Sequence, residues 1–165
     1  MIRLYVVSEG LTETNFVREI LTPHVEERWP ARLTVQAPNL RGKCAYAEVK
    51  KLIRTLLGNP AGAVLVTTMI DLYKLPADFP GYVECSVHED AWKRVEEMEN
   101  FLSEDVQDRR FIPHLQLHEF EALILTDVLC LAKYYPSHKD ELGRLAKSVE
   151  KECNDPRSLG SIFSR

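Results

Sequence analysis

Apolar and polar positions follow two alternating periods along most of the chain. Residues 3–7 (RLYVV) form a short apolar run typical of a β-strand, and residues 16–25 carry apolar side chains at helical spacing. Those apolar side chains are Phe16, Val17, Ile20, Leu21 and Val25. The order repeats in 31–38 and 45–56, and Gly58-Asn59-Pro60 ends the second helical segment. The pattern therefore predicts two successive strand–helix units.

The nearly continuous apolar run at 62–71 (GAVLVTTMID) predicts the central strand of a parallel sheet, because helices cover both faces of such a strand. Residues 72–84 contain proline and glycine and predict a loop, whereas 87–104 have helical spacing. Residues 111–117 (FIPHLQL) predict a fourth strand. The remainder has a helical pattern until about Cys153.

This alternation of strands and helices predicts an α/β fold with a mostly parallel central sheet and helices on both faces. A length of 165 residues with 45% hydrophobic content favours one domain over residues 1–165. No apolar run approaches the roughly 20 residues of a membrane span, and Met1-Ile2-Arg3 leads directly into the first strand. We therefore expect a cytoplasmic protein without a membrane partner.

The spacing of the cysteines and the net charge bear on two classes of function, zinc binding and nucleic-acid binding. Cys44, Cys85, Cys130 and Cys153 are far apart and form no zinc-finger spacing, so reduced and mostly buried thiols are expected. The net charge of −4 attracts no polyanion, so any binding of nucleic acid needs a local patch or a partner.

Acidic residues recur where the predicted strands end. They are Glu9 after the first strand, Asp71 after the third, and Glu119 and Glu121, beside His118, after the fourth. Ligands of open α/β sheets bind outside the carboxyl ends of the strands, so these groups can share one crevice. Carboxylates within about 4 to 6 Å of each other repel unless a cation neutralises them, and Mg²⁺ prefers carboxylate oxygens.

Each acid also has a purely structural interpretation. Glu13 stands in the first turn of the predicted helix, with Thr12 as the expected N-cap, and there stabilises the helix dipole. Glu13 also heads the apolar stripe of Phe16 and Val17, which predicts that it faces the sheet. Glu9 with Gly10 can simply form a strand exit, and Asp71 can start a turn.

The stretch HLQLHEFEALIL, residues 114–125, has a polar side. In a strand, His114, Gln116 and His118 share one face, which is either exposed or part of a site. Glu119 and Glu121 point the same way only if the backbone stays extended; on a helix His118 and Glu121 share a face instead.

Basic residues form one local group, and the known nucleotide and protease motifs are absent. Arg41, Lys43, Lys50, Lys51 and Arg54 make up that group, which is either a solvated surface or a contact for phosphate. The sequence contains no phosphate-binding loop, dinucleotide fingerprint or H-E-x-x-H zinc helix. His88-Glu89-Asp90 favours a solvated helix face, and Ser8 lacks the elbow of a serine hydrolase.

Three stretches together resemble a bacterial family catalogued as domain of unknown function 4276, which is similar to the TOPRIM domains of topoisomerases, primases and OLD-type nucleases. They are VVSEGLTETNFVREIL, TTMIDLYKLPADFPG and LHEFEALIL, in family order over roughly residues 1–150. The resemblance implies a three-layer α/β fold and a site that binds Mg²⁺ or Mn²⁺. It also implies that relatives continue beyond ECNDPRSLGSIFSR, so the chain is interpreted as truncated at the C-terminus or divergent.

The resemblance assigns metal-binding roles to the acids. Glu9 matches the glutamate after the first strand, and Glu13 matches the second acid of the E-G-x-T-E form in nucleases. Asp71 matches the first aspartate of an Asp-x-Asp pair, whose second position is Tyr73 here. Glu119 and Glu121 resemble a late acidic pair that supplies further ligands.

The resulting hypothesis is a metal-dependent nuclease of TOPRIM type, acting beside an ATPase partner and in defence against phage or foreign DNA. Glu9, Asp71 and His118 are its expected catalytic residues, with Glu9 as metal ligand or general base and His118 orienting a carboxylate or phosphate. Arg41, Lys43 and Lys50 are the expected contacts to DNA or RNA. A non-catalytic accessory module and a small-molecule phosphohydrolase are the alternatives.

Overall fold

The computed structural model describes residues 1–30, 32–59, 63–117 and 120–152, apart from the side chains of residues 74, 120–124, 126 and 152. By its internal contacts the chain divides into two compact units, Met1–Leu117 and His118–Arg165. The expectation of a single domain over residues 1–165 stays a prediction. No helix in the described part of the chain is long and apolar enough to cross a membrane.

The first unit is built on a parallel sheet. Its strands are β1 (Ile2–Ser8), β2 (Leu33–Gln36), β3 (Ala63–Asp71), β4 (Phe111–Ile112) and β5 (Leu115–Gln116). The order is β2-β1-β3-β4, and β5 also pairs with β3. All pairs are parallel. β3 has partners on both sides, so the prediction of 62–71 as the central strand is confirmed.

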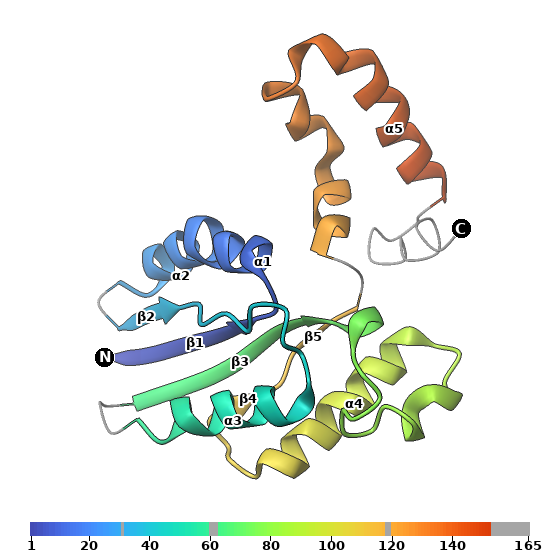
Figure 1. The fold of residues 1–165 in the computed structure, drawn as a ribbon. Helices are drawn as coiled ribbons and strands as arrows, with labels where there is room; N and C mark the ends of the chain where they lie inside the picture. The colour runs from blue at the N-terminus through green and yellow to red at the C-terminus, as the bar shows by residue number, and fades with distance from the viewer. Residues whose placement is uncertain (31, 60–62, 118–119, 153–165) are drawn as a thin grey trace. The chain divides into compact units, whose positions relative to one another are not determined.

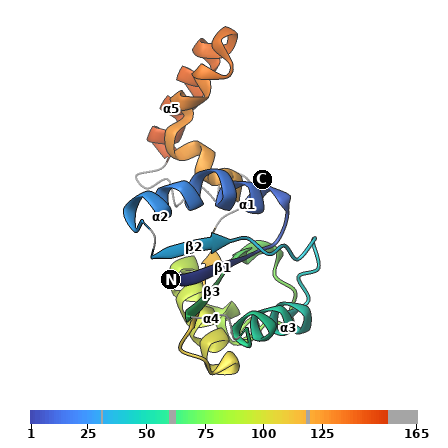
Figure 2. The same ribbon diagram turned by 90° about the vertical axis from the view of Figure 1, so that its left-hand side faces the viewer.

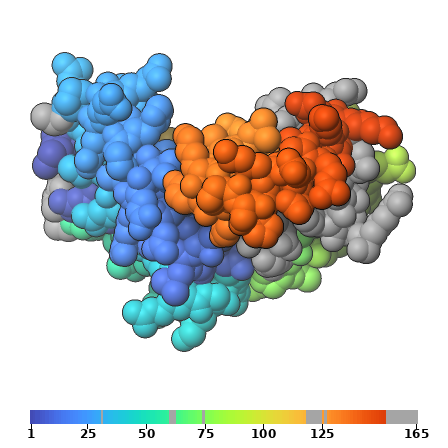
Figure 3. All heavy atoms as spheres, turned by 90° about the horizontal axis from the view of Figure 1, so that it is seen from above, coloured from blue at the N-terminus to red at the C-terminus, as the bar shows by residue number. Residues whose placement is uncertain are grey.

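Helices cover both faces of this sheet, as predicted (Figures 1 and 2). A continuous helical segment on one face consists of α1 (Leu11–Phe16), the π-helix η1 (Val17–Leu21) and α2 (Thr22–Arg28). Its side chains form the surface of that face in a view from above (blue, Figure 3). The other face carries α3 (Tyr46–Leu57) and α4 (Ala91–Val106).

The core fills the space between the sheet and α3 and α4. Val66 and Ile70 of β3, Ile53 of α3, and Met98 and Leu102 of α4 are all at most 2% exposed. These positions match the predicted apolar periods of their segments, a period of two in the strand and three to four in the helices. Burial of these side chains fixes β3, and with it the position of its carboxyl end.

The loop between β3 and α4 contains two short 3-10 helices, η2 (Leu72–Lys74) and η3 (Glu84–Val87). The helix predicted over 87–104 begins later, at Ala91, because Asp90 caps it and accepts a hydrogen bond from Trp92 N at 2.9 Å. It ends at Gln107, whose φ of 56° is left-handed.

The predicted fourth strand is divided into β4 and β5. Pro113 interrupts it, because proline has no N–H to donate to the ladder. Thr68 of β3 bridges the gap: its Oγ1 donates to His114 O at 2.7 Å and accepts from His114 N at 3.0 Å. The chain therefore stays parallel to β3 up to Gln116, which pairs with Asp71.

The second unit is helical, as its pattern predicts. It contains the 3-10 segment η4 (Phe120–Lys133), the short η5 (Pro136–His138) and α5 (Lys139–Glu152). Val128 and Val149 are buried in its own small core, with Leu125, Leu142 and Ala146 packed against them.

Candidate functional site

The turn after β1 is held on both sides by neighbouring strands and loops. Ser8 N donates to Pro38 O at 2.9 Å, and Ser8 O accepts from Leu40 N at 2.9 Å. On the other side Glu9 N donates to Met69 O of β3 at 3.3 Å. The position of Glu9 at the carboxyl end of the sheet is therefore fixed by backbone hydrogen bonds.

A buried hydroxyl pair supports the same turn. Ser8 Oγ lies 2.6 Å from Thr14 Oγ1, and both residues are at most 2% exposed. Thr14 Oγ1 also donates to Gly10 O at 2.7 Å and accepts from Asn39 Nδ2 at 2.8 Å. Strand β1, helix α1 and the loop after β2 are thus joined at one point.

Helix α1 starts earlier than predicted. Its N-cap is Gly10 and not Thr12, which is exposed in the first turn. Glu13 Oε2 reaches back and accepts from Gly10 N at 2.9 Å, an arrangement that satisfies one of the free N–H groups at the helix start. A side chain on Gly10 would crowd this contact, because its Cβ would lie 3.1 Å from Glu13 Oε2. Helix capping therefore accounts for one oxygen of Glu13.

The buried stripe of this helical segment differs from the predicted one. Val17 and Val25 are buried, but Ile20 is 59% exposed. The reason is the π-helix Val17–Leu21, which has more residues per turn than an α-helix and so rotates the stripe onto Thr14, Val17 and Val25. Glu13 is only partly buried beside this stripe.

Asp71 ends β3 and is only 3% exposed. A solvent-exposed turn residue would not be buried in this way, so the turn interpretation alone does not account for Asp71. Its register partner Gln116 places β5 next to it at the carboxyl end of the sheet. Tyr73, at the second position of the Asp-x-Asp pattern, is 57% exposed.

A cysteine reveals that the three described acids lie near one another. The pKa of the Cys44 thiol is raised from 9.0 to about 11, with burial as the largest cause. The negative charges of Glu9, Asp71 and Glu13 raise it further, in that order. The three carboxylates therefore act on the same thiol, although they come from three different elements.

This cluster has an oxygen suited to a hard cation. Glu9 Oε2 is buried and, within the described part of the chain, has no hydrogen-bond partner. The donors nearby are carboxylates, which fit Mg²⁺ or Mn²⁺. Among the described residues, however, no three His, Cys, Asp or Glu side chains are grouped so that they could hold a metal ion. The described acids therefore act together on Cys44, but they form no metal-binding group among the described residues.

The other predicted site residues are placed only in part. His118 and Glu119 lie outside the described residues, and Glu121 is known only as part of the helical backbone of η4. The alternative that keeps the chain extended through Glu121 is therefore wrong. His114 is exposed, with its Nδ1 3.8 Å from Glu99 Oε1.

The predicted nucleic-acid contacts differ in their surroundings. Arg41 and Lys43 are exposed in the loop after β2, where Arg41 has a left-handed φ of 56° and Gly42 a φ of 72°. Lys50 instead lies on the side of α3 that faces α4, 2.6 Å from Asp105. The assignment of all three to nucleic acid stays a prediction.

Asn39 and Cys44 are site residues that the sequence reasoning missed. Both follow β2, the one strand for whose end no acidic residue was proposed. Applying the strand-end rule to β2 as well would have found Asn39, which forms an isolated parallel bridge with Ser8 at the end of β1. No sequence signal would have singled out Cys44.

A comparison with known protein families gives a match. Residues 8–160 match the family described as Domain of unknown function (DUF4276). No curated protein and no solved structure shows significant similarity to the chain.

Proposed function

The chain belongs to the Domain of unknown function (DUF4276) family, whose description assigns no activity. From the acids of the site, together with the resemblance to TOPRIM nucleases, we propose that it is a Mg²⁺- or Mn²⁺-dependent nuclease of TOPRIM type. The observation that carries this proposal is the placement of Glu9 and Asp71 at the carboxyl ends of the neighbouring strands β1 and β3, with Glu13 in the next helical turn; all three charges act on Cys44. Such a concentration of negative charge is unfavourable unless the protein uses it to hold a cation.

The structure supports particular roles for the described acids. Glu9 Oε2 has no partner in the described part of the chain and is the first candidate ligand. Asp71, buried at the end of β3, is the second, whereas one oxygen of Glu13 already caps α1. The family resemblance assigns further ligand roles to Glu119 and Glu121, and these two assignments stay predictions.

The proposed reaction is hydrolysis of a phosphodiester bond. Water attacks phosphorus, the bond to one sugar oxygen breaks, and the proton of the water passes to the departing oxygen. A bound cation supplies positive charge for the attacking and leaving oxygens. The fixed turn after β1 orients Glu9, and the hydroxyl pair of Ser8 and Thr14 keeps that turn rigid.

A second candidate is a non-catalytic accessory module that keeps the fold. Two observations favour it: Tyr73 stands at the second aspartate position, and the described residues form no metal group. An ATPase partner remains part of both proposals, because the chain has no nucleotide-binding motif of its own.

Cleavage of supercoiled plasmid in Mg²⁺ or Mn²⁺ distinguishes the two functions. We expect nicking by the wild type, and a loss of about 100-fold or more in Glu9→Gln and Asp71→Asn, because each removes a charged ligand. Glu26→Gln is the matched control, since Glu26 is an exposed acid of α2. Nicking that survives both site substitutions would reject the metal site, and a wild type without cleavage would favour the accessory module.

A further inference from the structure

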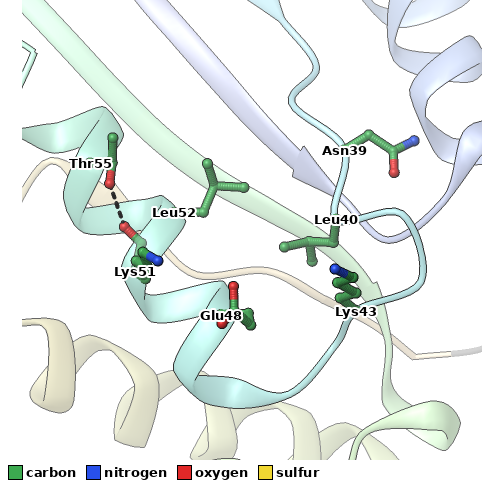
Figure 4. A pocket seen from close by; sticks show the side chains of 7 residues that line it. All are labelled: Asn39, Leu40, Lys43, Glu48, Lys51, Leu52 and Thr55. Carbon is green, nitrogen blue, oxygen red and sulfur yellow. Dashed lines mark hydrogen bonds between the residues drawn. The ribbon is translucent and has the colours of Figure 1, made fainter.

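A groove of about 240 Å³ lies between the loop after β2 and helix α3 (Figure 4). Leu40 of the loop and Leu52 of α3 point toward each other and form its apolar floor. Lys43 stands on the loop side and Lys51 on the helix side, with Glu48 on the helix side as well. The groove therefore has an apolar base and cations on two walls.

The loop wall of the groove is continuous with the carboxylate cluster. Gly42 N donates to Glu9 O at 3.0 Å, so the loop is hydrogen-bonded to the residue that heads the proposed metal site. Asn39, which also lines the groove, donates to Thr14 Oγ1 in the hydroxyl pair. Lys43 directly precedes Cys44, the thiol on which the three carboxylates act. A ligand in the groove thus lies beside the proposed site.

The two lysines of the groove are available for a ligand. Lys43 and Lys51 are exposed, and neither forms an ion pair within the described part of the chain. Lys50, their neighbour in sequence, differs because it pairs with Asp105 across to α4. With a net charge of −4, the protein can attract an anion only through such a local group of cations.

We propose that this groove, here called the lysine groove (Asn39, Leu40, Lys43, Glu48, Lys51 and Leu52), binds the backbone of one nucleic-acid strand next to the phosphodiester that is cleaved. The inference rests on the proposed nuclease function and specifies its substrate path. The apolar floor favours a single strand, whose sugars and bases are accessible, over a duplex, whose bases are stacked inside. Lys43 and Lys51 neutralise phosphate, and the leucines contact sugar or base.

The test is binding of a fluorescein-labelled single strand of about 12 nucleotides in EDTA, followed by anisotropy. Lys43→Gln and Lys51→Gln should each weaken binding by about two- to fivefold, the effect of one exposed charge pair. The slope of log K against the logarithm of the salt concentration should become less steep by about 0.7 for each lysine removed. Glu48→Gln should act in the opposite direction and tighten binding, because it removes the repelling charge of the groove.

Lys93→Gln is the matched control, because Lys93 is an exposed lysine of α4 outside the groove. Equal affinities of the wild type and both lysine variants, or no binding by the wild type, would overturn the inference. Displacement by polyglutamate as efficient as by unlabelled strand would assign the groove to acidic peptides instead. Because EDTA removes the metal, these results do not depend on cleavage: loss of cleavage with groove binding intact rejects only the proposed function.

Discussion

Two cysteines of the first unit lie beside carboxylates, and their surroundings differ in an instructive way. Cys85 is fully buried, and its Sγ donates to Glu97 Oε2 at 3.8 Å. The same oxygen lies 2.6 Å from His88 Nε2. Burial, and then the charge of Glu97, raises the pKa of the Cys85 thiol, whereas Arg94 lowers it. The Glu97 carboxylate therefore interacts with two side chains, the Cys85 thiol and the His88 imidazole.

The Cys44 cluster has a different balance. Its three carboxylates all raise the pKa of the thiol, whereas at Cys85 the cation of Arg94 acts against the carboxylate. Glu9 Oε2 is also buried without a partner in the described part of the chain. An unpaired buried polar atom costs about 1–3 kcal/mol, so it persists where binding of a ligand compensates for it. Arg94 Nε, whose side chain acts on Cys85, is also buried without a partner in the described part of the chain, so the two surroundings differ in their carboxylates. Glu97 has described partners, and Glu9 Oε2, the candidate ligand, has none there.

The largest expected effect is on plasmid cleavage, and it distinguishes Glu9 from Glu97. Glu9→Gln should lower metal-dependent plasmid cleavage by about 100-fold or more, because it removes a charged ligand. Glu97→Gln should leave cleavage unchanged and lower the free energy of unfolding by about 1 kcal/mol, since it weakens the contacts to His88 and Cys85. Cleavage and urea unfolding, measured on both variants, check this; equal loss of cleavage in both would contradict the comparison.

A smaller effect of about tenfold is expected in the reactivity of the two thiols. Saturating Mg²⁺ should accelerate alkylation of Cys44 by iodoacetamide at pH 9, because neutralised carboxylates no longer raise its pKa and the thiolate is the reacting form. Cys85, which is fully buried, should not respond. Peptide mass spectrometry resolves the two sites. An unchanged Cys44 rate in Mg²⁺ would show that no cation binds near it, whether or not the protein cleaves DNA.

The sequence was sufficient to predict the fold because its signals are local. The apolar run 62–71 and the periodic segment 45–56 predicted β3 and α3 to within a few residues. The strand-end rule then placed Glu9 and Asp71 at the carboxyl end of the same sheet, where the structure has them. Both successes depend on short-range periodicity and on the geometry common to parallel sheets.

The remaining features depend on contacts between distant residues. The π-helix that exposes Ile20 has no distinct periodicity in the sequence. The pairing of Lys50 with Asp105, 55 positions apart, follows only from the packing of α3 against α4. Cys44 could not be singled out either, because its importance comes from charges on three other elements.

Two adjacent lysines extend the comparison of satisfied and unsatisfied groups. Lys50 lies 2.6 Å from Asp105, which also accepts a hydrogen bond from the Tyr46 hydroxyl. Lys50→Gln should therefore lower the free energy of unfolding by about 1 kcal/mol or less, as for a part-exposed ion pair, and leave strand binding unchanged. Lys51→Gln should instead weaken strand binding and leave the free energy of unfolding unchanged. Urea unfolding measures the stability of both variants, and anisotropy measures their affinity for the strand. Weaker strand binding by Lys50→Gln would mean that Lys50 contacts nucleic acid, as the sequence predicted.

The smallest expected effect is on stability at alkaline pH. The folded-state pKa of Cys44, about 11, is higher than its ordinary value of 9.0, so the unfolded chain releases this proton first. The stability that the protonated thiol contributes is complete below pH 9 and is lost as the pH rises toward 11.

Cys44→Ser removes this titration, whereas the buried Tyr46 hydroxyl, whose pKa is also raised, titrates in both proteins. The wild type should thus lose about 0.5 kcal/mol or less relative to Cys44→Ser between pH 9 and 11, because solvent screens a part-exposed group. Urea unfolding across that range measures the difference, and parallel pH profiles of the two proteins would mean that neither burial nor the carboxylates raise the pKa of Cys44 in the folded protein.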